Sequence, residues 1–162
     1  MFMKRFTIVS VAVLLSLIVL SSNSFAQVGL KFGPRAGTDT KNGDFFAGAQ
    51  VEARILMITF APNVEYVFVK DTKQYNVNLD AQYTVLGVGV AKLFAGGGYI
   101  MSISDPDKVG GIDPKAKTLN GFNVQFGGKA GLAGFELFAL VKHMRIDNEG
   151  NNALVAGMNF GF

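Results

Sequence analysis

The feature that most constrains this sequence is a period-two alternation of side chains, which is clearest at the end of the chain. In residues 151–162 every second position is apolar: Leu154, Ala156, Met158, Phe160 and Phe162. The intervening positions are mostly small or polar, as Gly157, Asn159 and Gly161 are. Successive side chains of a β-strand point to opposite faces, so this alternation predicts a strand with one apolar face.

The same alternation recurs along the chain after residue 27. It predicts eight strands, at residues 28–33, 45–55, 58–68, 75–85, 92–103, 122–130, 135–142 and 153–162. Pro62 falls inside the third of these, and because proline cannot donate a hydrogen bond to a ladder, we expect a local irregularity there. The pattern predicts an all-β chain that folds as an eight-stranded antiparallel up-and-down barrel.

The segments between these strands differ in character. Polar, charged or Gly-rich segments follow the odd-numbered strands, at residues 34–44, 70–74, 104–118 and 147–152. Short connections follow the even-numbered strands, at residues 56–57, 87–89 and 131–134. Long loops at one end and short turns at the other are typical of outer-membrane barrels, so we expect this asymmetry in the fold.

Residues 1–26 have the composition of a secretory signal peptide. Lys4 and Arg5 precede the apolar stretch 8–20, and small residues occupy Ser24 and Ala26. This order predicts cleavage between Ala26 and Gln27, which leaves residues 27–162 as the barrel domain. The apolar stretch is shorter than the roughly 20 residues of a membrane-spanning helix, and the alternative of an uncleaved anchor is therefore disfavoured.

Composition excludes several other classes of protein. The chain contains 15 Lys and Arg against 12 Asp and Glu, and removal of Lys4 and Arg5 with the leader leaves 13 against 12, a net charge of +1. Such a small charge gives no electrostatic basis for binding nucleic acid. The chain has no Cys, which excludes both a disulfide framework and a lipoprotein anchor.

Apolar runs of helix-spanning length are absent after the leader, so a membrane-embedded domain would have to be a closed barrel. Aromatic residues fall at two levels of the predicted strands, as at the two interfaces of a membrane barrel. One level contains Phe45, Phe68, Tyr75 and Phe122, and the other contains Phe60, Tyr83, Phe135, Phe160 and Phe162. The alternative fold is a soluble lipocalin-type barrel, which would direct its apolar face inward.

The mature chain resembles the small eight-stranded outer-membrane β-barrel family, the OmpX-like or "porin family" barrels. The resemblance rests on three stretches, residues 61–66, residues 93–99 and the Phe-ended final strand. It implies a transmembrane barrel in a bacterial outer membrane. It also implies that Met158, Phe160 and Phe162 form the C-terminal signal that the barrel-assembly machinery reads.

The polar face of the strands carries many charges, including Lys31 and Arg35. Eight of them balance, four of each sign: Glu52, Arg54, Glu65, Asp80, Lys92, Lys129, Glu136 and Lys142. Eight strands leave a lumen just wide enough for side chains, so we expect these charges to pair in a filled interior. The alternative is a polar channel or a solute site.

Residues with catalytic or metal-binding chemistry are sparse. His143 is the one histidine, and Ser102 and Ser104 are its only distant candidate partners for a hydrolytic triad. Asp105, Asp107 and Asp113 fall short of EF-hand spacing, because Val109 and Ala116 occupy ligand positions. We therefore expect no enzyme activity, no cofactor and no metal.

The function favoured by these features is a non-enzymatic structural or surface-interaction role through extracellular loops. A narrow transporter or binder of small or lipidic molecules is the first alternative, and an outer-membrane lipid-modifying enzyme is the second. Expected partners are outer-membrane lipid and, during biogenesis, the barrel-assembly machinery. We expect the protein to be a monomer.

Overall fold

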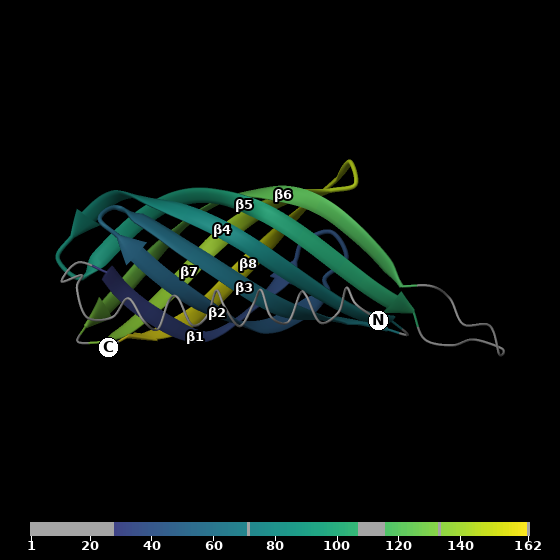
Figure 1. Ribbon diagram of the computed structural model, residues 1–162, viewed down its shortest axis with the longest axis horizontal. Helices are drawn as coiled ribbons and strands as arrows, with labels where there is room; N and C mark the ends of the chain where they lie inside the picture. The colour runs from purple at the N-terminus through teal and green to yellow at the C-terminus, as the bar shows by residue number, and fades with distance from the viewer. Residues whose placement is uncertain (1–27, 71, 107–115, 133, 162) are drawn as a thin grey trace, which may run out of the picture.

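The computed structural model describes residues 28–70, 72–106, 116–132 and 134–161. Over these ranges the chain forms a closed barrel of antiparallel strands in sequence order, and β1 closes the barrel by pairing with β8 (Figure 1). The strands are β1 (Val28–Asp39), β2 (Phe45–Ile55), β3 (Ile58–Val69), β4 (Thr72–Val88), β5 (Ala91–Pro106), β6 (Lys117–Leu132), β7 (Phe135–Ile146) and β8 (Glu149–Gly161). The predicted eight-stranded up-and-down architecture is confirmed. In the described ranges, no helix is long and apolar enough to cross a membrane.

Several strands are longer than the alternation of apolar residues predicts. β4 contains 17 residues, and β5 and β6 contain 16 each. The predicted loop at residues 34–44 is largely strand, because β1 continues to Asp39 and pairs with β2 and β8. The expectation was wrong because the polar composition of this stretch suggested a loop. Its backbone N–H and C=O groups form hydrogen bonds with two neighbouring strands, and these bonds do not depend on the side chains.

The barrel has two ends that differ less than expected. The turn end carries the β2–β3, β4–β5 and β6–β7 connections and the end of β8, and the loop end carries the other four connections. At the loop end, β3 and β4 pair as far as Val69↔Thr72, and residues 147–148 join β7 to β8 as tightly as residues 56–57 join β2 to β3. Asp147 and Asn148 have φ angles of 47° and 67°, as a two-residue type I′ hairpin turn requires. The connections at this end are therefore shorter than predicted, because β4 begins at Thr72 and β8 at Glu149, inside the predicted connections 70–74 and 147–152.

Two prolines interrupt ladders without shifting their register. Pairing of β2 with β3 runs to Gln50↔Asn63 and resumes at Ala53↔Phe60, on either side of Pro62. Pairing of β1 with β8 has a similar gap beside Pro34, which the sequence had suggested lay in a loop. A missing N–H explains both gaps, because proline cannot donate to the neighbouring strand.

Large apolar side chains cover the outside of the barrel. The predicted aromatic residues near the loop end are exposed, namely Phe45, Phe68, Tyr75 and Phe122. So are those near the turn end that the structure describes, namely Phe60, Tyr83, Phe135 and Phe160. A soluble barrel would direct its large apolar side chains inward. Here those side chains are exposed on the outside and the buried charges lie inside, so that alternative fold is excluded.

Candidate functional site

The interior of the barrel gathers the side chains of one parity from every strand. In β7, residues 136, 138, 140, 142 and 144 are buried, whereas the residues between them are exposed. The interior is therefore built from residues far apart in the sequence, and only barrel closure brings them into contact.

Four charged side chains form the centre of this interior. Arg35 Nη2 lies 3.0 Å from Glu65 Oε1, and Lys142 Nζ lies 3.9 Å from the same oxygen. Lys142 Nζ also lies 3.6 Å from Asp80 Oδ2. All four residues are almost completely buried, so their mutual pairing replaces the water that each charge has lost. Two positive and two negative groups leave this central cluster electrically neutral.

Amide side chains also donate hydrogen bonds to the carboxylates of Glu65 and Asp80. Asn63 and Asn123 donate to the two oxygens of Asp80, at 2.9 and 2.7 Å. Asn78 donates to Glu65 Oε2 at 3.2 Å. Each carboxylate thus receives neutral hydrogen bonds as well as ion pairs, which is how a buried charge is made tolerable.

Gln50 connects the central cluster to the charges nearer the turn end. Its Oε1 accepts from Arg35 at 3.0 Å, and its Nε2 donates to Glu52 at 3.0 Å and to Asn159 at 2.8 Å. Glu52 in turn pairs with Lys129, whose ammonium lies 4.9 Å from the centre of the Phe94 ring. The result is a continuous polar network from Lys129 to Asp80 through seven side chains: Lys129, Glu52, Gln50, Arg35, Glu65, Lys142 and Asp80.

The remaining predicted interior charges lie at the turn end. Glu136 pairs with Lys31 at 2.9 Å. Among the residues that the structure describes, no ion pair joins Arg54 or Lys92 to an acidic side chain. The predicted balance of four basic and four acidic groups omitted Lys31 and Arg35, so the interior holds six basic against four acidic groups. Lys31 lies on the inward parity of the predicted strand 28–33, and Arg35 shares that parity because β1 continues past residue 33.

Apolar side chains fill the part of the interior that the polar network leaves. They form one cluster, made of Phe46, Val67, Phe94, Ile100, Phe138, Leu140, Met144, Ala153 and Val155. Phe94, Gly127, Leu140, Val155, Gly37 and Phe46 are successive cross-strand neighbours, so a single apolar row winds around the inner wall. Gly127 and Gly37 leave room for the two phenylalanine rings, which an added Cβ would strike.

A cup opens at the loop end, above the central cluster. Its volume is about 300 Å³, and Glu65 lies at its floor. One wall is polar, with Gln74 and Asn76 from β4 and Ser102 and Ser104 from β5. Apolar side chains adjoin this polar wall on both sides, with Phe46 and Val67 on β2 and β3 and with Leu119, Met144 and Ile146 on β6 and β7; Val67 is the cross-strand neighbour of Gln74 and Leu119 that of Ser102. A concave site that combines polar and apolar side chains has the general character of a small-molecule site.

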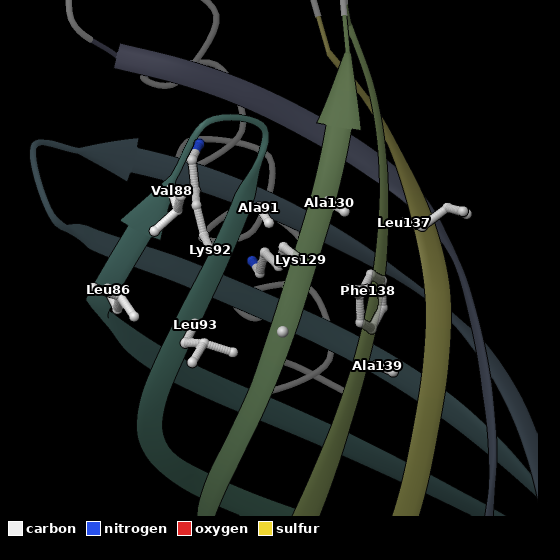
Figure 2. Close-up of a pocket in the computed structure, with 11 residues that line it drawn as sticks. Leu86, Val88, Ala91, Lys92, Leu93, Lys129, Ala130, Leu137, Phe138 and Ala139 are labelled. Atoms are coloured by element: carbon white, nitrogen blue, oxygen red, sulfur yellow. The ribbon is translucent and has the colours of Figure 1, made fainter.

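A second depression lies on the outer surface near the turn end (Figure 2). It has a volume of about 410 Å³, and Leu86, Val88, Leu93 and Leu137 line it with alanines between them. Figure 2 also shows Lys92 extending along β5 toward the β4–β5 turn. Apart from Lys92 and Lys129 its lining is apolar, and Lys129 pairs with Glu52 inside the barrel, so this depression belongs to the apolar exterior and offers few polar groups that would orient a solute.

The residues considered for catalysis lie on opposite faces of the barrel wall. His143 is exposed on the outside, where its Nδ1 lies 2.7 Å from Asn152 Oδ1, whereas Ser102 is buried inside. Ser104 also points inward, so the wall separates these side chains and they form no triad. Within the described residues no group of three potential ligands could hold a metal ion. Asp105 lies in β5, and Asp107 and Asp113 fall outside the described residues.

The predicted processing and assembly residues are partly described. Met158 and Phe160 face outward on β8, and the Phe160 ring lies 5.5 Å from that of Phe135. Ala26, Gln27 and Phe162 lie outside the described residues.

Comparison with known proteins gives a relationship of fold. No protein-family model matches the chain, and no curated protein sequence matches it significantly. The barrel is similar to the N-terminal β-barrel domain of Pseudomonas aeruginosa OprF, with 14% identity, 84% of this chain and 98% of that one covered, and a TM-score of 0.70. Neisserial surface protein A matches at 18% identity, with 83% and 97% covered and a TM-score of 0.67.

A third similar structure is Ail, the attachment invasion locus protein of Yersinia pestis, solved in complex with the heparin analogue sucrose octasulfate. It matches at 11% identity, covers 83% of this chain and 97% of that one, and has a TM-score of 0.54. All three share the small closed barrel architecture with this chain.

Proposed function

We propose that this chain is an outer-membrane barrel protein that does not conduct solutes and acts as a structural or surface-interaction protein. The observation that carries the proposal is the contrast between the two faces of the wall. The outside is apolar over its whole circumference, with exposed aromatic residues near both ends, whereas buried ion pairs fill the inside. An apolar exterior of this kind suits lipid, and an interior filled in this way suits a barrel without a water-filled channel.

The similar structures support the same role, because their names include a surface protein and an attachment protein. β3 and β4 pair as far as Val69↔Thr72, and only residues 147–148 separate β7 from β8, so strand ends and the cup carry more of the proposed surface role than the sequence suggested. In this proposal the loop end faces outward from the cell and the turn end faces the periplasm, and residues 1–26 are removed between Ala26 and Gln27.

The test has two measurements on one preparation. Cell fractionation should place the protein in the outer membrane, and the unheated protein should migrate differently from the boiled protein on a gel. In a planar bilayer the refolded protein should give no stable conductance steps. Large, stable steps would contradict the filled interior, and recovery from the soluble fraction would contradict the location.

The proposed partners during biogenesis are outer-membrane lipid and the barrel-assembly machinery, and we propose a monomer. Deleting Phe162 should impair assembly more than export, because the outward-facing Met158 and Phe160 precede it on the same parity of the closing strand. The measurement is the amount of heat-modifiable protein in the membrane against the amount in the periplasm. Deletion of Asn42, which lies in a connection at the other end, is the matched control. Equal assembly of the two deletion variants would count against the signal.

A further inference from the structure

We propose that the cup at the loop end binds one ring of a neutral saccharide. The inference deepens the proposed surface role and rests on it, since it names the chemical class that the outward end of the barrel would take. The loop end is the end at which the yellow hairpin joins β7 and β8 in Figure 1.

The first reason is an unsatisfied buried acceptor in the polar wall. Asn76 is 7% exposed, and no donor among the described residues reaches its buried Oδ1 atom. A buried polar atom without a partner is costly, and a ligand hydroxyl would satisfy it. Ser102 and Ser104 lie beside it on β5, and the Gln74 amide donates to Ser102 Oγ at 3.3 Å.

The second reason is that the cup combines a polar wall with apolar side chains on either side of it. Amide and hydroxyl groups both donate and accept, so they match ligand hydroxyls, which also do both. The adjoining side chains of Phe46, Val67 and Met144 can cover only an apolar surface. A pyranose ring carries hydroxyls at its edge and C–H groups on its faces, so it can contact both kinds of side chain. An acyl chain would leave the polar wall dehydrated and unpaired, which is unfavourable.

The third reason is that the charges lining the cup have no positive surplus. Lys41 pairs with Glu149 at 3.0 Å, and Glu65 at the floor pairs with Arg35 and Lys142. Lys117 and Asp147 are one charge of each sign. Asp39 remains as one acidic group, and its Oδ1 accepts the backbone N–H groups of residues 41–43, so nothing in the cup would attract an anionic ligand.

The size of the cup limits the ligand. Small-molecule pockets have volumes of about 300–1,000 Å³, and this cup, at about 300 Å³, lies at the lower limit. A single sugar ring, free or at the end of a glycan, is a ligand of suitable size.

The experiment uses the full mature chain, refolded in a phosphocholine detergent because detergents with sugar headgroups would compete. Carbon-13 labelling of methionine methyl groups provides the readout, since Met144 lines the cup while Met57, Met101 and Met158 lie on the outside of the barrel. The probes are the methyl glycosides of glucose, galactose and mannose, with glucosamine and glucuronate as charged counterparts. We expect at least one neutral glycoside to shift the Met144 signal saturably and to leave the other three methionine signals unchanged.

Two variants test the placement of the ligand. Ser104→Phe fills the mouth of the cup and should abolish the shift, whereas Ile103→Phe, which adds a ring on the other face of β5, should leave it unchanged. Asn76→Ala removes the unsatisfied acceptor and should weaken binding about three- to tenfold. Retention of heat-modifiable migration shows that each variant has folded.

The inference fails if no neutral glycoside shifts Met144, if the charged sugars bind more tightly than the neutral ones, or if Ile103→Phe weakens binding as much as Ser104→Phe. If the protein is heat-modifiable and located in the outer membrane but binds none of the glycosides, this inference fails and the proposed function is still supported. If the refolded barrel binds a glycoside but fractionation does not find the protein in the outer membrane, the binding site is supported and the proposed surface role is contradicted.

Discussion

The polar network and the apolar cluster both fill the barrel interior, but different interactions stabilise them. In the network each charge depends on particular partners, as Glu65 depends on Arg35 at 3.0 Å and on Lys142 at 3.9 Å. In the cluster, Phe94, Leu140 and Val155 depend only on being close-packed along one row of the wall. Removing one charge leaves another buried and uncompensated, whereas removing one apolar side chain leaves a cavity. The two regions should therefore respond differently to substitution and to salt.

The largest expected effect comes from breaking the network at its centre. Arg35→Met should lower the free energy of unfolding by about 3–5 kcal/mol, because Glu65 and Asp80 would then share only Lys142. Denaturant titration of the refolded protein, followed by gel mobility, measures this change.

The matched control for that variant is the double substitution of Arg35→Met with Glu65→Leu. It leaves Lys142 and Asp80 as a balanced pair at 3.6 Å, so it should recover most of the lost stability. If the double variant is no more stable than Arg35→Met alone, Arg35 acts through packing and not through charge.

The next effect tests the apolar cluster. Leu140→Ala should cost about 2–5 kcal/mol through lost burial and the cavity beside Phe94. The loss should be the same at low and high salt, since no charge is involved. Val141→Ala is the control, because the neighbouring side chain is 52% exposed on the outside. An equal loss for Val141→Ala would show that the inner row is not a packed core.

The smallest effect is expected at the rim, where Lys41 and Glu149 form an exposed pair. Lys41→Gln should change the free energy of unfolding by less than about 1 kcal/mol, and added salt should reduce even that difference. A loss comparable to that of Arg35→Met would contradict the distinction between buried and exposed pairs.

Much of the architecture could be predicted from local patterns. A period of two identifies which residues share a face whatever their partners are, so the outward positions of Phe45, Tyr83 and Phe160 followed from parity alone. Strand ends could not be predicted in this way. Arg35 and Asp39 lie in a polar stretch, and only the strands on either side of β1 show that the stretch is paired backbone.

The sequence by itself determined that this chain alternates, how many strands it forms and which side chains lie inside. It could not determine which of those side chains meet. Gln50 contacts Arg35 and Asn159, and Lys142 lies between Glu65 and Asp80, because the closed sheet brings strands from both halves of the chain to one interior. Partners in a barrel are set by register and by closure of β1 on β8, and both are properties of the assembled sheet.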